Sequence, residues 1–417
     1  MGAGMYKMAK KCYKFAHQTG KAIPATPIST DLFTDITASD MKLDRLIALL
    51  ISSMMWLSSN AAQPQPQSPV NTFADNYSVS FITMQEGLSH NFVEDIFRDS
   101  KGYMWIATSG SLARYDGYEF VNFTPNSISR HIKSSFVRKM SEDKFGRLWV
   151  VSDGGVDVIN LNDLNPVELS GNGNFKKISV TPASYITSDG DSNIWFRNNK
   201  EVVCIQFDDN GNIRNITTLP HQTTATITLG AIESLPGIDR GVLTGIAGEV
   251  CLLTIENDRI ISKPLSPALS LDPSNYIADF IKVDSIIWIA TDAGLYSYDT
   301  SSRRVKVYKG GDGKPGTLSQ TFVTSLELTE NGELIAGCLN GLNIYDRATD
   351  GFYQVSASDI DGRPHGLNND FINCLIAEGD NVWVGTEGCG INLFSPRKLY
   401  SKMLRHNSAD PETISPN

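Results

Sequence analysis

Short runs of alternating apolar and polar residues recur along the chain, and turn-forming segments separate them. In the clearest copy, residues 92–97 alternate, residues 99–102 (Asp-Ser-Lys-Gly) form a break, and residues 104–108 are a second apolar run. Two further runs follow, the last of them after the Asp-Gly pair at residues 116–117. A two-residue period between such breaks is typical of β-strands joined by hairpins. Each copy therefore predicts four short antiparallel strands.

This pattern occurs seven times at a nearly constant spacing. The centre of each second run is a large apolar residue, and these anchors are 44 to 48 residues apart: Trp105, Trp149, Trp195, Val242, Trp288, Ile335 and Trp383. A period of this length, without helical periodicity between the copies, is typical of a β-propeller in which every repeat is one four-stranded blade. The sequence therefore predicts an all-β fold, a seven-bladed β-propeller over residues 76–400. We expect each anchor to lie on the second strand of its blade and to face the next blade.

The segments that flank the repeats predict how the ring closes. Residues 76–84 alternate like a lone strand in front of the first repeat. Their position predicts that they complete the last blade beside residues 390–394 and so close the propeller. Residues 401–417 resemble the linker before another repeat, because residues 414–417 echo residues 88–91. We interpret residues 401–417 as the start of a following repeat or as a linker.

The amino-terminal segments have the composition of an export signal and a tether. In residues 41–62, Lys42 and Arg45 precede an apolar run at residues 46–57, and small residues follow up to Ala62, which is the order of a secretory signal peptide. The run is shorter than the roughly 20 residues of a spanning helix, although a signal anchor is the alternative. We interpret residues 1–40 as a non-native or disordered extension and residues 63–75, rich in Pro, Gln and Ser, as a polar linker. We therefore expect a periplasmic location.

Composition excludes some classes of partner and narrows the chemistry of the cysteines. The chain is 41% hydrophobic and 20% charged, as in ordinary globular proteins, and its net charge is −10. A basic surface is what a phosphate backbone needs, so we expect no nucleic-acid partner. Five cysteines follow residue 62, and their odd number and irregular spacing indicate buried free thiols rather than a disulfide framework: Cys204, Cys251, Cys338, Cys374 and Cys389.

Three segments of the first repeat resemble the two-component-regulator propeller repeat: residues 87–91 (Gly-Leu-Ser-His-Asn), 99–108 (Asp-x-x-Gly-x-x-Trp-Ile-Ala-Thr) and 114–117 (Arg-Tyr-Asp-Gly). The resemblance extends over residues 77–417 and is strongest in repeats one, two, five and seven. That repeat builds the periplasmic sensor region of hybrid two-component systems, mostly in Bacteroidetes. The resemblance implies that this chain is an amino-terminal sensor propeller.

The same resemblance implies partners and a ligand. The parent protein would continue with a second propeller, a β-sandwich domain, a transmembrane helix and a histidine kinase, and a homodimer is one arrangement of it. Because many sensors of this family control genes for the use of complex glycans, the resemblance implies an oligosaccharide ligand.

Local motifs of catalysis are missing from the sequence. It contains no His-Glu-x-x-His, no Gly-x-Ser-x-Gly and no Walker loop, so we predict no catalytic residue, no metal and no cofactor. The alternative is an enzyme that resembles streptogramin lyase, also a seven-bladed propeller, with a metal and a histidine in the channel. His90 and His365 precede predicted inner strands of the first and last repeats, which are neighbours in a closed ring.

A candidate ligand site lies where the chain runs into the innermost strands. The residue just before each predicted inner strand is polar in six repeats: Asn91, Ser135, Thr181, Asn275, Thr321 and Asp370. His90, Gln320 and Asn369 lie next to these positions, and we call all nine residues the strand-start set. A ring of mostly neutral donors and acceptors suits a hydroxyl-rich ligand at the mouth of the channel. The alternative is that these side chains only satisfy backbone groups at the strand ends.

Overall fold

The computed structural model describes residues 76–396 except 170–172, 192, 199, 221–230, 238–240, 247 and 358–365. The interpretations of residues 1–40, 41–62, 63–75 and 401–417 therefore lie outside the described residues.

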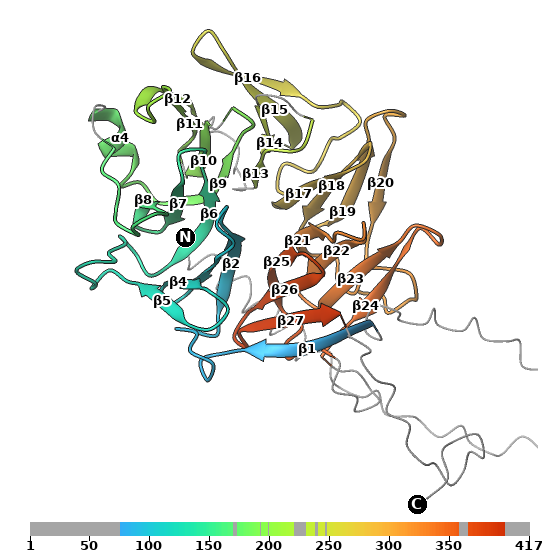
Figure 1. Ribbon diagram of the computed structural model, residues 1–417. Coiled ribbons are helices and arrows are strands. Elements are labelled where there is room, and N and C mark those ends of the chain that lie inside the picture. The colour runs from blue at the N-terminus through green and yellow to red at the C-terminus, as the bar shows by residue number, and fades with distance from the viewer. Residues whose placement is uncertain are drawn as a thin grey trace, which may run out of the picture. The chain divides into compact units, whose positions relative to one another are not determined.

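Seven antiparallel sheets follow one another along the chain, and each is one blade (Figure 1). Blade 1 consists of β2 (Val93–Arg98), β3 (Met104–Thr108), β4 (Leu112–Tyr115) and β5 (Phe120–Phe123), and blade 2 of β6 (Val137–Glu142), β7 (Arg147–Ser152) and β8 (Gly155–Asn160). Blade 3 consists of β9 (Ala183–Ser188), β10 (Ile194–Asn198), β11 (Glu201–Phe207) and β12 (Ile213–Pro220), and blade 4 of β13 (Ile232–Glu233), β14 (Gly241–Ile246), β15 (Glu249–Glu256) and β16 (Arg259–Pro264). Blade 5 consists of β17 (Ile277–Val283), β18 (Ile286–Thr291), β19 (Gly294–Asp299) and β20 (Val305–Tyr308), and blade 6 of β21 (Val323–Leu328), β22 (Leu334–Cys338), β23 (Gly341–Asp346) and β24 (Gly351–Val355). Blade 7 consists of β25 (Ile372–Glu378), β26 (Asn381–Thr386), β27 (Ile391–Pro396) and, from the other end of the chain, β1 (Tyr77–Ile82).

The first strand of each blade is its inner strand, and the inner strands surround the propeller axis. Consecutive inner strands contact one another around the whole ring, in the order β2, β6, β9, β13, β17, β21, β25 and back to β2. The chain thus forms the predicted seven-bladed β-propeller.

The ring closes through strand exchange between the two ends of the described chain. Strand β1 pairs antiparallel with β27, from Tyr77 opposite Pro396 to Ile82 opposite Ile391. The Tyr77 ring also packs edge-on against Phe394, with 6.5 Å between ring centroids. Figure 1 shows the blue β1 beside the red β27. The predicted closure by the amino-terminal strand is confirmed.

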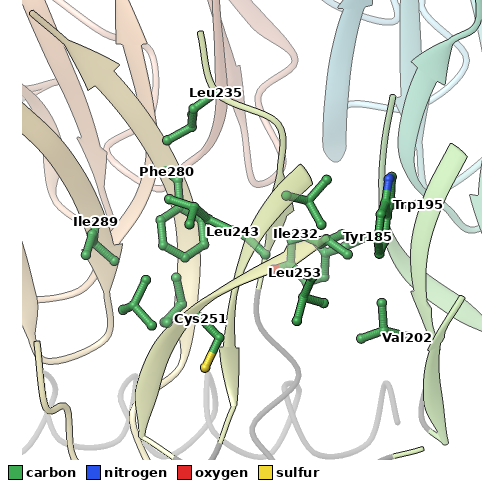
Figure 2. Packing of buried hydrophobic residues seen from close by; sticks show 14 of the residues in the cluster. Tyr185, Trp195, Val202, Ile232, Leu235, Leu243, Cys251, Leu253, Phe280 and Ile289 are labelled. Atoms are coloured by element: carbon green, nitrogen blue, oxygen red, sulfur yellow. The ribbon is translucent and has the colours of Figure 1, made fainter. Parts of the chain in front are cut away.

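The seven anchor residues form the contacts between blades. Each lies on the second strand of its blade and is buried. Trp105 of blade 1 clusters with Met140 and Leu148 of blade 2, and Trp195 of blade 3 clusters with Ile232 and Leu243 of blade 4 (Figure 2). Because two amphipathic sheets must cover each other's apolar faces, a large side chain at this position buries surface of both blades. The predicted position and direction of the anchors are confirmed.

Aspartates in the hairpins between first and second strands hold the anchor tryptophans. The indole Nε1 of Trp105 donates to Asp99 Oδ2 at 2.8 Å, and the same bond joins Trp195 to Asp189 at 2.8 Å. The other carboxylate oxygen of Asp99 accepts the backbone N–H groups of the turn. Buried indole N–H groups need such a partner. The Asp-x-x-Gly pattern is therefore a structural device of the blade.

Blade 2 departs from the four-strand pattern, because within the described residues it has three strands. After β8, Leu164 adopts a φ of 62°, and Pro166 lies where a fourth strand would pair. Two backbone hydrogen bonds, from Val167 N to Val158 O at 2.8 Å and from Asn160 N to Asn165 O at 2.9 Å, flank a single bridge between Ile159 and Pro166, and no further bridge extends this pairing among the described residues. A short helix, α4 (Gly173–Ile178), then leads toward β9.

The cysteines within the described residues are free thiols. Cys204, Cys251, Cys338 and Cys374 are buried, whereas Cys389 is half-buried in the turn before β27.

Candidate ligand site at the mouth of the ring

In four blades of the part that the structure describes, two segments meet at one end of the ring, which we call the mouth. One segment leads into the inner strand, and the other is the turn between the second and third strands. A backbone hydrogen bond joins them at the same position in four blades: Ser109 N to Phe92 O, Asp153 N to Phe136 O, Asp292 N to Tyr276 O and Glu387 N to Phe371 O, at 3.0 to 3.2 Å. This repeated bond fixes the residues that precede the inner strands.

The strand-start set lies in these segments, mostly half-buried, and His90 is exposed. Seven of its nine side chains bond to nearby backbone groups: Asn91, Thr181, Thr321, Asp370, His90, Gln320 and Asn369. For example, Asn91 Oδ1 accepts the N–H of Met84 at 2.9 Å, and Asp370 Oδ1 accepts that of Ala357 at 2.6 Å. These bonds are what the backbone-capping alternative predicts, and the ligand-binding role of the set stays a prediction.

Sequence reasoning missed a second feature of the mouth. The residue that follows the strand-start position is aromatic in five blades, and we call these five side chains the aromatic rim: Phe92, Phe136, Tyr276, Phe322 and Phe371. Phe136 is 48% exposed and Phe371 is 44% exposed, and the others are half-buried. The ring centroids of Tyr276 and Phe322 lie 6.2 Å apart. Blades 5, 6, 7, 1 and 2 are consecutive, so the rim follows a continuous arc.

Acidic side chains accompany the rim in three blades. They belong to the residues whose N–H groups bond to rim carbonyls, namely Asp153, Asp292 and Glu387. Asp153 forms a bidentate ion pair with Arg138, and Asp292 Oδ1 accepts the N–H of Tyr276 at 2.9 Å. Burial raises the pKa of Glu387.

Deeper along the axis, the inner strands carry a group of charged side chains, which we call the axial cluster: Asp95, Lys139, Glu233, Asp279 and Glu327. Lys139 Nζ lies 2.9 Å from Asp95 Oδ1. Asp95 Oδ2 also accepts the N–H of Met140 at 3.1 Å, and Asp279 Oδ2 accepts that of Leu326 at 2.8 Å. Each of these bonds runs from one blade to the next. The cluster therefore joins blade 1 to blade 2 and blade 5 to blade 6.

The electrostatics of the axial cluster are unbalanced, because four carboxylates share one ammonium. Burial raises the pKa of Glu233 to about 8 and that of Glu327 to about 7, and it also raises the pKa values of Asp95 and Asp279. Burial alone would lower the pKa of Lys139, but the carboxylates of Asp95 and Asp279 outweigh it and raise that pKa. Burial thus favours the protonated form of these carboxyl groups, and Glu233 holds its proton at neutral pH.

The part of the chain that the structure describes offers no metal-binding group and no membrane-spanning helix. There, no group of three His, Cys, Asp or Glu side chains is placed to hold a metal ion. No helix of that part is long and apolar enough to cross a membrane. The sequence-based pairing of His90 with His365 falls on a residue outside the described ones.

The ring and its mouth define the class of the protein, a seven-bladed β-propeller with a candidate ligand site at one end of its axis. The family model described as two component regulator propeller matches residues 87–110, the first half of blade 1. The chain therefore carries a two-component-regulator propeller repeat, as its sequence resemblance indicated. No curated protein sequence matches the chain.

Solved structures with the same fold include extracellular domains of two component and one component systems and a lyase. The chain is similar to the extracellular domain of a proposed hybrid two component system from B. thetaiotaomicron, with a TM-score of 0.58, 19% identity and coverage of 77% of this chain and 42% of that one. A second such domain, of a proposed one component system from the same organism, gives a TM-score of 0.58, 20% identity and coverage of 77% and 40%. Virginiamycin B lyase from Staphylococcus aureus gives a TM-score of 0.54, 12% identity and coverage of 77% and 100%.

The identities to these structures are low, so the likeness concerns the fold. The chain also spans about two fifths of the length of the two extracellular domains. The activity, ligands and partners of those longer proteins come to this chain only as proposals.

Proposed function

We propose that this chain is the ligand-sensing propeller of a two-component signalling system and that it binds its ligand at the mouth without altering it. The observation that carries the proposal is the two-component-regulator propeller repeat in blade 1. The likeness of the whole ring to extracellular domains of such systems supports it.

The proposed location is the periplasm, and residues 41–62 are the proposed export signal. The proposed partners are a second propeller and the signalling domains of a parent protein, with a homodimer as one arrangement. A ligand shifts a conformational equilibrium only by its difference in affinity for the two states. On this proposal the propeller supplies the binding energy, and the parent protein supplies the second state and the signal.

The proposed ligand is an oligosaccharide. Sugars present hydroxyl groups together with apolar ring faces, and recognition sites of this kind combine aromatic surfaces with a few placed polar groups. The mouth offers both kinds of group, because the exposed rings of Phe136 and Phe371 stand directly after Ser135 and Asp370. This adjacency supports binding at the mouth rather than at the outer strands.

A second candidate function is an enzyme that resembles streptogramin lyase. The fold likeness to virginiamycin B lyase favours it, although at 12% identity that likeness extends to the fold alone. His90 is exposed, and its Nδ1 accepts the N–H of Phe92 at 3.0 Å. Metal analysis of the purified chain separates the two functions, because stoichiometric divalent metal together with turnover of a bound ligand favours the lyase.

Calorimetry of the full chain against a panel of oligosaccharides tests the proposal. We expect one saturable site, with binding weakened in Ser135→Ala and in Phe136→Ala and with the ligand recovered unchanged. Asp258→Asn, in the hairpin between β15 and β16, is a control outside the mouth. Chemical conversion of the ligand would overturn the sensor assignment, and affinity unaffected by both mouth variants would overturn the mouth as the site.

A further inference from the structure

Glu387 occupies a distinctive place on the aromatic rim. Its N–H donates to the carbonyl of Phe371 at 3.0 Å, and its backbone forms an antiparallel bridge with Phe92. Glu387 is therefore held between the segments that lead into β25 and β2, next to two residues of the rim. Its side chain is half-buried. No hydrogen bond or ion pair of this carboxylate is found among the described residues.

The carboxylates around Glu387 outnumber the cations. Burial raises the pKa of Glu94, and the carboxylate of Glu387 raises it further, while Arg138 opposes both effects. Arg138 is already engaged, since its guanidinium lies 3.1 Å from Glu94 and 3.1 Å from Asp153. With the axial cluster below, the interacting groups are seven carboxyl groups and two cations: Glu94, Asp95, Asp153, Glu233, Asp279, Glu327 and Glu387 with Arg138 and Lys139. The raised pKa values of Glu233, about 8, and of Glu327, about 7, favour the protonated form of these two. Among the described residues at the mouth itself, the carboxylates of Glu94, Asp153 and Glu387 face the single cation Arg138, so an incoming cation meets a negative field.

Exposed aromatic side chains beside a carboxylate favour one sign of charge in a ligand. The faces of aromatic rings attract cations through the ring quadrupole and repel anions. Phe371, at 44% exposure, offers such a ring on the residue whose carbonyl accepts the N–H of Glu387. A half-buried carboxylate forms stronger hydrogen bonds with an ammonium than with a neutral hydroxyl. Both preferences favour a cationic ligand.

We propose that the mouth selects an oligosaccharide that carries protonated amines, with an ammonium group of the sugar bound by Glu387 and the sugar rings lying on Phe371 and Phe92. This inference rests on the proposed function and names the ligand class of the same site. It differs from the sequence-based expectation, since a mostly neutral strand-start set predicts little salt dependence, whereas an ammonium–carboxylate contact predicts weaker binding as salt rises.

Two trisaccharides that differ only at their nitrogens test the inference. The probes are the glucosamine trimer, at a pH where its amines are protonated, and its fully N-acetylated, uncharged counterpart. We expect the full chain to bind the amine trimer at least about tenfold more tightly, because hydrogen bonds to charged groups exceed neutral ones by roughly that factor. We also expect this preference to shrink with added salt.

A matched pair of variants locates the effect. Glu387→Gln keeps the shape of the side chain and removes its charge, and we expect it to weaken amine-trimer binding about tenfold while leaving the N-acetylated trimer unchanged. Glu330→Gln makes the same charge change at an exposed residue of the hairpin after β21, and we expect no effect on either trimer. Thermal denaturation of each variant confirms folding, and the salt dependence of the unmodified chain tests the inference if Glu387→Gln fails to fold.

The outcomes separate this inference from the proposed function. Equal affinity for both trimers, or an amine preference that survives Glu387→Gln, overturns the amine inference while the binding function stands. If the chain binds only uncharged oligosaccharides, the amine inference is also overturned and the binding function stands. If no saccharide of either kind binds, both the inference and the proposed oligosaccharide function fail.

Discussion

Replacement of Trp149 by alanine tests the packing of the ring most sharply. Trp149 lies on β7, fully buried, and its ring packs against Phe207 of blade 3 with 5.7 Å between centroids. It also packs edge-on against Phe175 at 6.0 Å. The substitution therefore removes contacts between blades 2 and 3 as well as a contact with α4.

The expected loss of unfolding free energy comes from the lost burial of the indole and from the cavity that it leaves. Truncation of a buried Trp or Phe to Ala typically costs about 3 to 5 kcal/mol of unfolding free energy. The lost bond from Trp149 Nε1 to Asp143 Oδ2 adds little, because Arg147 Nε still donates to that oxygen at 2.7 Å. Since each kcal/mol shifts the melting temperature of a large domain by about 2 to 4 °C, we expect Trp149→Ala to melt about 6 to 20 °C lower.

Thermal and denaturant unfolding followed by circular dichroism provide the assay. Ser135→Ala is the matched control at the mouth, since it removes one hydroxyl from a half-buried position and should cost less than about 1 kcal/mol. Trp149→Phe should fall between the two, because it keeps an aromatic ring and loses the indole N–H. Equal midpoints for Trp149→Ala and Ser135→Ala would refute the assignment of the anchors to the contacts between blades.

Three further predictions concern closure, protonation and metal. Deletion of residues 76–84 removes β1 and leaves β27 with an unpaired edge, so we expect a lower melting temperature and aggregation in light scattering. A variant that stays monomeric and melts at the same temperature would contradict closure by this strand. The pKa of Glu233 is raised to about 8 from an ordinary 4.5, so between these values the folded chain holds a proton that the unfolded chain releases. The free energy of unfolding should therefore fall as pH rises from about 5 to 8, and Glu233→Gln should flatten that slope in denaturant titrations. An unchanged slope in the variant would count against the axial cluster. If sensing needs no metal, a chelator should leave ligand affinity in calorimetry unchanged, and lost affinity that is restored by one divalent metal would favour the lyase.

The ring could be predicted because the same pattern of strands and turns occurs seven times, so the fold does not depend on any single copy. The seven anchors and the closing strand could be placed from spacing alone. Blade 2 shows the limit of a period, since among its described residues only one bridge, between Ile159 and Pro166, stands where the repeat predicts a fourth strand.

The mouth was predictable in position but less so in chemistry. The spacing located Asn91 and Asp370 before their inner strands, but their bonds to Met84 and Ala357 depend on loops that no period describes. The aromatic rim was visible in the sequence, one residue after five of the six strand-start positions. The axial cluster was not, because the contacts of Asp95 with Lys139 and of Asp279 with Leu326 arise only when separate repeats meet around one axis.

Amide hydrogen exchange of the full chain, with and without a bound oligosaccharide, tests the central claim most directly, because it locates the ligand without assuming its contacts. We predict slower exchange in the mouth segments, residues 90–92, 135–137 and 386–390. The hairpins between first and second strands, residues 99–102 and 143–146, should be unchanged. Protection confined to those hairpins or to the outer strands would contradict ligand sensing at the mouth.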